Sequence, residues 1–343
     1  MSEKSNGSLF QELEQRFGLD QKKAHIGNSN PFLTFFRENL GILIGLLVLC
    51  AVVYFVNPVF LTTNNVMNVL RQITTNLYLA LAMTMVIILG GIDLSVGSTM
   101  ALVGVVTTMS IAILEFPIFL AVILGLFVGI LVGAINGYFA AATPIPPFII
   151  TLAMMNMARG AAFILTEGAP VRVMSPQFNF IGSGFIGVLP IPVLYLLVFI
   201  IICYFIMNKT KLGRHIYAVG GNLEAARFSG INIKKVKFFA FTFSGFMAAF
   251  AGIVLASRMF SGQPTAGDGA ELDAIAAVVL GGTSMSGGIG KIGGTVIGAL
   301  IIGVLNNGLN LMGVSSFWQI VVKGFVILVA VYADVLKRKS AAA

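Results

Sequence analysis

Polar side chains inside the long apolar segments are the residues of this sequence that could do chemistry. Three of them carry a charge: Asp93, Arg159 and Lys323. A charge at the centre of a membrane helix costs roughly 2.5–3.5 kcal/mol, so such side chains face the protein interior or a cavity. The more numerous amides offer both donors and acceptors, which suits a polar, uncharged solute such as a sugar.

These side chains are candidates for lining a translocation pathway. The candidates are Asn76, Asp93, Asn136, Asn156, Asn306 and Asn310. The alternative is that the amides only join helices to one another, since hydrogen bonds and small residues hold membrane bundles together. The sequence lacks the row of paired carboxylates that is typical of proton-driven carriers. That absence counts against an ion-coupled mechanism.

The sequence contains no complete motif for catalysis, nucleotide binding or metal binding. The segment 288–293 matches G-x-G-x-x-G, but an apolar span follows it and no soluble strand precedes it. Ile292 stands where a phosphate-binding loop requires Ser or Thr. Cys50 and Cys203 lie in apolar runs and are interpreted as packing residues. We therefore expect no enzyme activity, no cofactor and no metal site in this chain.

The composition indicates what kind of molecule positions these residues. Of 343 residues, 57% are hydrophobic and only 10% are charged, whereas a soluble domain has about 25% charged residues. The net charge of +8 comes from basic residues in short loops and tails between apolar runs, which argues against nucleic acid as a partner. The sequence predicts an all-α, polytopic membrane protein.

Apolar runs of about twenty residues predict the spanning helices. Nine runs are clear: 39–57, 73–90, 98–114, 117–142, 147–165, 190–207, 238–258, 292–311 and 317–335. Both tails carry Lys and Arg residues, although acids balance those of the first tail, and both are predicted to prefer the cytoplasm, which requires an even number of crossings. The short, glycine-broken stretch 272–286 is therefore predicted to be a tenth, discontinuous span.

Three parts follow from this count. Residues 1–38 form a cytoplasmic tail, residues 39–336 the transmembrane domain, and residues 337–343 a second cytoplasmic tail. Within the first tail, the capping box at 8–11 predicts a short surface helix. The first apolar run begins near Leu40, too far along the chain for a cleavable signal.

A short internal echo marks two places where helices could break. Residues 86–97 and 277–288 both contain an aliphatic run, a Gly-Gly pair, and Ser and Gly at matching offsets. The glycines, which let a backbone break inside a membrane domain, are Gly90, Gly91, Gly281 and Gly282. Transporters often carry internal repeats with interrupted helices, although a match this short could also arise by chance.

A polar segment at 208–237 interrupts the apolar pattern, with seven basic residues against one acid. Such a block is predicted to be cytoplasmic. Asn222 is a good N-cap and Gly230 a natural C-cap, so a two-turn helix is expected after a flexible Gly220-Gly221. Two turns are marginal alone, so this helix must pack on its own domain or on a partner. Its candidate contact residues are Asn222, Glu224, Ala225, Ala226, Arg227 and Gly230.

Four motifs resemble those of one protein family. They are GGIDLSVGS at 90–98, GGNLEAARFSGIN at 220–232, the glycine-rich stretch at 261–291, and NNGLNLMGVSS at 306–316. Together they resemble the permease subunits of bacterial ABC sugar importers of the ribose/galactose/xylose type, in the binding-protein-dependent transport permease family. The likeness runs from about residue 40 to 336 and is strongest to ribose permeases.

The resemblance implies the rest of a transport machine in the bacterial inner membrane. It implies a second copy of the permease, a separate ATPase subunit with two nucleotide-binding halves, and a soluble sugar-binding protein. It also implies that 222–230 is the coupling helix that receives the ATPase. Two alternatives stay open: the same machine importing another pentose, a hexose or inositol, and a secondary sugar carrier that works alone.

Overall fold

The computed structural model describes residues 31–342, with side chains for residue 36 and residues 39–332. The helix predicted around the capping box at 8–11 lies outside this range. The chain divides into two units, residues 1–40 and 41–343. The architecture below is that of the second unit.

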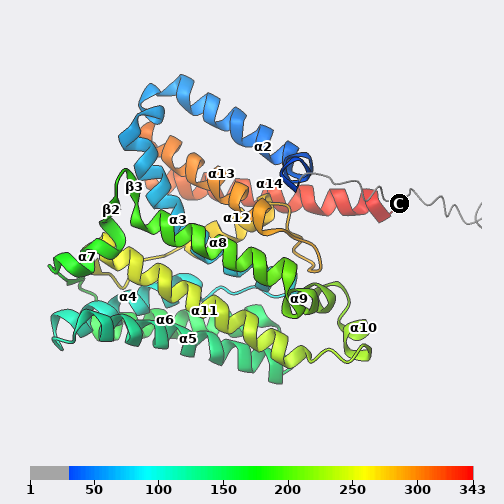
Figure 1. Cartoon of the computed structure of the whole chain (residues 1–343), viewed down its shortest axis with the longest axis horizontal. Coiled ribbons are helices and arrows are strands. Elements are labelled where there is room, and N and C mark those ends of the chain that lie inside the picture. The colour runs from blue at the N-terminus through cyan, green and yellow to red at the C-terminus, as the bar shows by residue number, and fades with distance from the viewer. Residues whose placement is uncertain (1–30, 343) are drawn as a thin grey trace, which may run out of the picture. The chain divides into compact units, whose positions relative to one another are not determined.

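Helices make up almost all of the described chain (Figure 1). In order they are α2 (Pro31–Val56), the 3-10 turn η1 (Pro58–Leu61), α3 (Thr63–Ile88), α4 (Val96–Ala112), α5 (Ile118–Ala142), α6 (Pro147–Thr166), α7 (Pro176–Ser183), α8 (Ile191–Lys209), α9 (Lys211–Gly221), α10 (Leu223–Phe228), α11 (Ile233–Arg258), α12 (Ala270–Leu280), α13 (Ile292–Leu311) and α14 (Ser316–Ala342). The predicted all-α class is confirmed.

Four two-residue strands form two small antiparallel ladders. β1 (Val171–Arg172) pairs with β4 (Ser261–Gly262), with Val171 opposite Gly262. β2 (Phe185–Ile186) pairs with β3 (Leu189–Pro190) in a hairpin. The first ladder joins the α6–α7 and α11–α12 connections, whereas the second lies within the α7–α8 connection.

Each predicted span overlaps one helix. In the described part of the chain, seven helices are long and apolar enough to cross a membrane, and Val96–Ala112 and Ser316–Tyr332 are shorter apolar helices. The predicted discontinuous span corresponds to α12, which has only 11 residues. α3 begins ten residues before the predicted run at 73, because its first turns are rich in Thr and Asn. The number of crossings stays a prediction.

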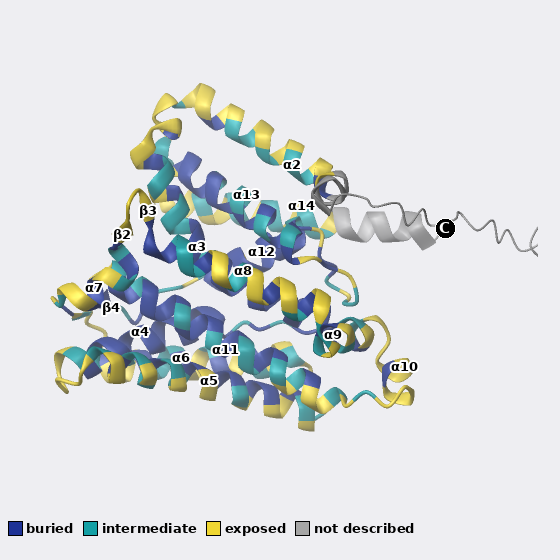
Figure 2. Cartoon of the chain, viewed as in Figure 1, coloured by how far each residue is buried: buried dark blue, intermediate teal, exposed yellow. Residues whose placement is uncertain are grey.

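α3 forms the centre of the bundle. Its residues from Leu77 to Ile88 are all buried, whereas α2 at the edge of the bundle is largely exposed (yellow in Figure 2). A helix that is apolar on every side belongs in an interior rather than on a surface. α3 packs against α8, α11, α12 and α13, so helices from both halves of the chain meet on it.

Small residues bring α5 and α11 into close contact. A methyl group on Gly133 would lie 2.9 Å from the Gly245 Cα atom, and one on Gly129 would lie 2.7 Å from the Gly245 carbonyl oxygen. Such approaches are typical of membrane helices, where small residues let backbones pack directly. α11 is therefore fixed on both sides, by α5 and by α3.

The helix contacts repeat between the two halves of the chain. α4 packs against α5, α6 and α11, while α12 packs against α13, α14 and α3. Each of these helices follows an irregular connection, 89–95 before α4 and 259–269 before α12. We interpret α2–α6 and α8 with α11–α14 as two five-helix repeats. The predicted five crossings of each repeat would give the two repeats opposite orientations in a membrane.

The echoed glycine pairs terminate two neighbouring helices rather than equivalent ones. α3 ends before Gly90 at φ +87°, and α12 ends before Gly282 at φ +82°. Both close in the same way: Gly91 N–H donates to the Val86 carbonyl and Thr283 N–H to the Val278 carbonyl. Glycine adopts such left-handed positions without strain. Because α3 packs against α12, the two ends lie close together.

Candidate functional site

The polar segment at 208–237 folds into two short helices, α9 and α10. The Thr210 hydroxyl accepts a hydrogen bond from Gly213 N–H at 3.2 Å and caps α9. Asn222 closes α9 by donating its N–H to Ala218 and opens α10 by accepting from Ala225 N–H at 2.9 Å. Gly230 follows α10 at φ +77°. One residue thus joins the two helices with no linker.

The expectation of a flexible Gly220-Gly221 pair is wrong. Both glycines lie in the last turn of α9. The physical reason is packing, because a methyl group on Gly220 would overlap the backbone of Ile88. Glycine serves close approach here rather than mobility.

α10 has one face toward the protein and one toward solvent. Ala226 is 3% exposed and belongs to the main apolar core. Glu224 and Arg227 form an exposed ion pair at 3.1 Å. The two alanines therefore differ in role, because Ala225 is exposed while Ala226 is buried.

Phe228 is not among the contact residues that the sequence predicted for this helix. It is 87% exposed at the end of α10. An exposed aromatic beside an arginine matches the composition of residues that dominate protein–protein binding. The signal available in the sequence was a large apolar residue in an otherwise polar loop.

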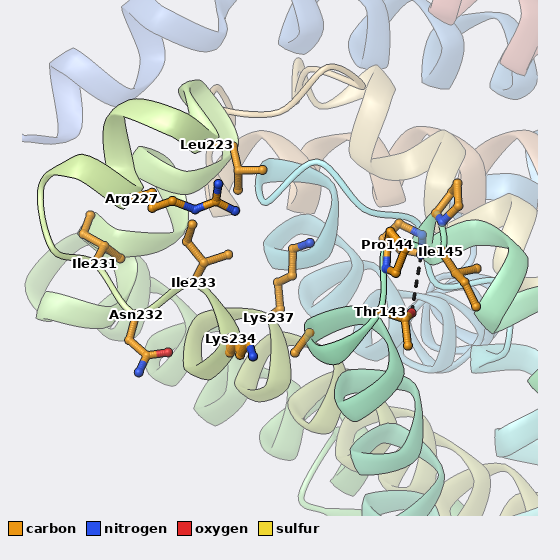
Figure 3. Close-up of a pocket in the computed structure, with 13 residues that line it drawn as sticks. Thr143, Pro144, Ile145, Leu223, Arg227, Ile231, Asn232, Ile233, Lys234 and Lys237 are labelled. Carbon is orange, nitrogen blue, oxygen red and sulfur yellow. Dashed lines mark hydrogen bonds between the residues drawn. The ribbon is translucent and has the colours of Figure 1, made fainter.

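A groove of about 570 Å³ opens beside α10 (Figure 3). The α5–α6 connection at 143–147 forms one side, and α10 with the start of α11 forms the other. Arg227, Lys234 and Lys237 line it, and none of its lining residues is acidic. Lys237 Nζ donates to the Ala140 carbonyl at 3.3 Å. The groove is therefore basic and partly apolar.

A third connection reaches the same end of the bundle. The Tyr217 hydroxyl of α9 donates to the Gly290 carbonyl, at 2.8 Å, in the α12–α13 connection. Burial raises the pKa of the Tyr217 phenol, so this hydroxyl keeps its proton. The connections 143–147, 210–232 and 281–291 thus lie together.

Other connections meet at the opposite ends of these helices from α9. They are the α6–α7, α7–α8 and α11–α12 connections. The β1–β4 ladder is there, and Arg258 at the end of α11 donates to the Arg71 carbonyl at 2.9 Å. The Arg71 guanidinium also stacks 5.0 Å from the centre of the Phe185 ring. The connections around α9 and α10 therefore lie at one end of the bundle, and those around α7 and the β2–β3 hairpin lie at the other (Figure 1). This arrangement is the one expected when the helices between them span a membrane.

Two of the pathway candidates, Asp93 and Asn136, form a buried polar cluster in the α3–α4 connection. Asp93 is 1% exposed and accepts bonds from the Ser95 N–H at 3.0 Å and the Ser95 hydroxyl at 2.6 Å. Asn136 of α5 donates to the same hydroxyl at 2.9 Å. Within the described residues, the Asn136 side-chain oxygen is buried without a hydrogen-bond partner.

A second polar group links three helices. Asp273 of α12 pairs with Lys323 of α14 at 2.9 Å and accepts from Asn76 of α3 at 3.4 Å. Sequence inspection noted Lys323 but not its partner, because the two lie fifty residues apart. The ion pair neutralises both charges inside the bundle.

The remaining candidates are dispersed. Asn306 is 4% exposed, and its side-chain oxygen has no hydrogen-bond partner among the described residues. Asn310 is exposed and accepts from Gln319 at 2.8 Å, while exposed Asn156 bonds only its own helix, at Leu152. The Arg159 guanidinium donates hydrogen bonds to the carbonyls of Pro264 and Ala266. The six pathway candidates do not converge on a single site.

Fold and site together define a class: a polytopic helical membrane protein built from two repeats, with a capped helix presented at one end. A family model described as the permease component of the branched-chain amino acid transport system matches residues 65–331. The chain belongs to this family of transport permeases.

Curated relatives are similar over most of their length. The chain is 47% identical to the ribose import permease protein RbsC of Bacillus subtilis, over 95% of this chain and 99% of the relative. It is 46% identical to RbsC of Haemophilus influenzae, over 85% and 91%. It is 37% identical to the xylose transport system permease protein XylH of Escherichia coli, over 93% and 98%. No solved structure matches the chain.

Proposed function

We propose that this chain is the membrane permease subunit of an ATP-driven ribose importer. The observation that carries the proposal is the 46–47% identity to ribose import permeases, against 37% to a xylose permease. The family description names branched-chain amino acids, so membership alone leaves the substrate open. Another pentose, a hexose or inositol is the alternative cargo.

In this proposal a separate ATPase subunit with two nucleotide-binding halves docks on α10. Exposed Phe228 and the Glu224–Arg227 pair offer it an anchor with a charged rim. The basic groove beside α10 extends the surface. Asn222 and Gly230 set the ends of the helix, and Ala225 lies on its exposed side.

The proposed orientation places α9, α10 and both chain termini in the cytoplasm, within the bacterial inner membrane. Seven basic residues in 208–237 favour that side. The soluble sugar-binding protein then meets the opposite end, near the β1–β4 ladder. A second copy of the permease completes the pathway.

The proposed pathway uses amides that have unmet hydrogen-bond capacity. Buried polar atoms normally have partners, and the side-chain oxygens of Asn136 and Asn306 have none in the described chain. A passing sugar hydroxyl could donate to each. Asn76 and Asp93 already have protein partners and shape the path, while Asn156 and Asn310 contribute at its margins.

Uptake of labelled ribose into proteoliposomes tests the proposal. Vesicles containing permease, ATPase and binding protein should accumulate ribose when ATP is present, and should stop when any component is left out. Transport by the permease alone would instead show a stand-alone secondary carrier. If labelled ribose is not transported, uptake of labelled xylose, galactose and inositol in the same vesicles identifies the cargo.

A further inference from the structure

The last turn of α9 lies against the end of α3 and against the α12–α13 connection, which are far apart in the sequence. Gly288 N–H, in the α12–α13 connection, donates to the Ile88 carbonyl at the end of α3, at 2.8 Å. Gly220 faces this pair: a methyl group there would overlap the Ile88 carbonyl oxygen and lie 2.8 Å from the Gly288 nitrogen. Three segments therefore meet backbone to backbone.

A second contact lies one turn earlier on the same side of α9. The Tyr217 hydroxyl donates to the Gly290 carbonyl at 2.8 Å. Residues three apart share one face of a helix, so Tyr217 and Gly220 hold the same connection at two points. That connection takes left-handed conformations at Gly287 and Gly288, with φ +85° and +74°, which only glycine adopts readily.

α9 and α10 are joined directly and pack against each other. Asn222 is the last cap of α9 and the first cap of α10, so no linker separates the two helices. Ala226 also packs α10 onto the apolar core. A displacement of α10 therefore acts directly on the last turn of α9.

We propose that Gly220 and Tyr217 are positioning residues that carry the displacement of α10 to the end of α3 and to the α12–α13 connection. The inference rests on the proposed docking of an ATPase at α10. Backbones in direct contact pass on a displacement, because a close-packed interior has no room to absorb it. Asp93 follows α3 in the α3–α4 connection and Asp273 lies in α12, each at a polar group inside the bundle.

The test compares two neighbouring glycines in the complete importer. Permease, ATPase and ribose-binding protein are reconstituted in liposomes, and ribose uptake and ATP hydrolysis are measured in the same vesicles. Gly220→Ala should hydrolyse ATP but move at least about fivefold less ribose per ATP, the lower range of coupling between sites. Gly221→Ala should match the unaltered protein, because a methyl group there meets nothing within 4 Å.

Tyr217→Phe supplies a milder variant that loses a single hydroxyl. It should also lower the ribose moved per ATP, and it decides the question if Gly220→Ala does not insert. A purely structural role would reduce the amount of folded protein but leave the ratio unchanged in what remains. An unchanged ratio in the tested variants overturns the inference.

Two kinds of failure are distinguishable. If the unaltered permease does not retain the ATPase on co-purification, the proposed function and this inference fall together. If the ATPase binds and ribose is imported, but Gly220→Ala and Tyr217→Phe keep the normal ratio, only the inference is wrong.

Discussion

At the scale of single residues, Phe228 has the clearest consequence. It is 87% exposed on α10, and exposed aromatic anchors contribute about 2 kcal/mol or more to an interface. Phe228→Ala should weaken ATPase binding by roughly thirtyfold, which is about 2 kcal/mol at 25 °C. The measurement is a titration of ATPase onto permease held in lipid nanodiscs.

A matched control removes an equally exposed aromatic from another helix. Phe119, on the first turn of α5, is 77% exposed, and Phe119→Ala should leave ATPase affinity unchanged. Equal affinity for all three proteins would show that α10 does not dock the ATPase through this side chain. Ala226→Asp is a poor probe of docking, because that residue is buried in the chain's own core.

The Asp273–Lys323 pair gives a second prediction at this scale. Removing one partner leaves an uncompensated charge in the interior, so Lys323→Met should destabilise the permease by about 2 kcal/mol. The double variant Asp273→Asn with Lys323→Met should recover most of that loss. Thermal unfolding in detergent measures both. A double variant no more stable than Lys323→Met would refute the pairing.

At the scale of helices, the α5–α11 contact depends on the absence of side chains. A methyl group on Gly133 would lie 2.5 Å from the Phe241 carbonyl oxygen and 2.9 Å from the Gly245 Cα atom. Overpacking of this kind costs about 1–3 kcal/mol, so Gly133→Ala should lower the unfolding temperature.

Gly160→Ala is the corresponding control in α6. Nothing lies within 4 Å of a methyl group there, and alanine is the better helix former by about 1 kcal/mol. Its unfolding temperature should equal or exceed that of the unaltered protein. A similar loss in both variants would contradict the packing argument.

The helices also show what the sequence could and could not predict. Apolar length predicted a helix at each of the nine runs where the structure has one, and the stretch that charge parity suggested as a tenth span contains the 11-residue α12. Cap residues located α10, because Asn222 and Gly230 act locally. The helical state of Gly220 was missed, since it depends on contact with Ile88, 132 positions earlier in the sequence. The partner of Lys323 was missed for the same reason.

The pathway was the hardest part to predict. An asparagine in a span is equally suited to lining a path or joining helices, and only its neighbours decide. Asn65 and Asn307 donate to each other at 3.0 and 2.9 Å, which fits the helix-joining alternative. Asn136 and Asn306 keep an unmatched oxygen within the described residues. Composition does not separate these cases, because burial is set by tertiary packing.

At the scale of the whole molecule, the two sets of connections lead to a prediction of sidedness. Cys50 and Cys203 are first replaced by serine and alanine, respectively, and single cysteines are then placed at Ile186 or Phe228, both exposed. Seven basic residues in 208–237 predict a cytoplasmic position for the segment that contains Phe228. The sequence predicts six crossings before that segment, and the β2–β3 hairpin precedes the sixth of them, so the hairpin is predicted to lie on the opposite side.

In intact spheroplasts that contain the permease without the ATPase, so that α10 is uncovered, a membrane-impermeant thiol reagent should therefore label Ile186→Cys and leave Phe228→Cys unlabelled. Opening the membrane should make both react, which controls for local access. Ile145→Cys, in the groove beside α10, should behave like Phe228→Cys, because the α5–α6 connection lies at the same end. Labelling of Phe228→Cys in closed spheroplasts would show that α10 lies outside the cytoplasm, contrary to the predicted orientation. An ATPase in the cytoplasm could not then reach α10.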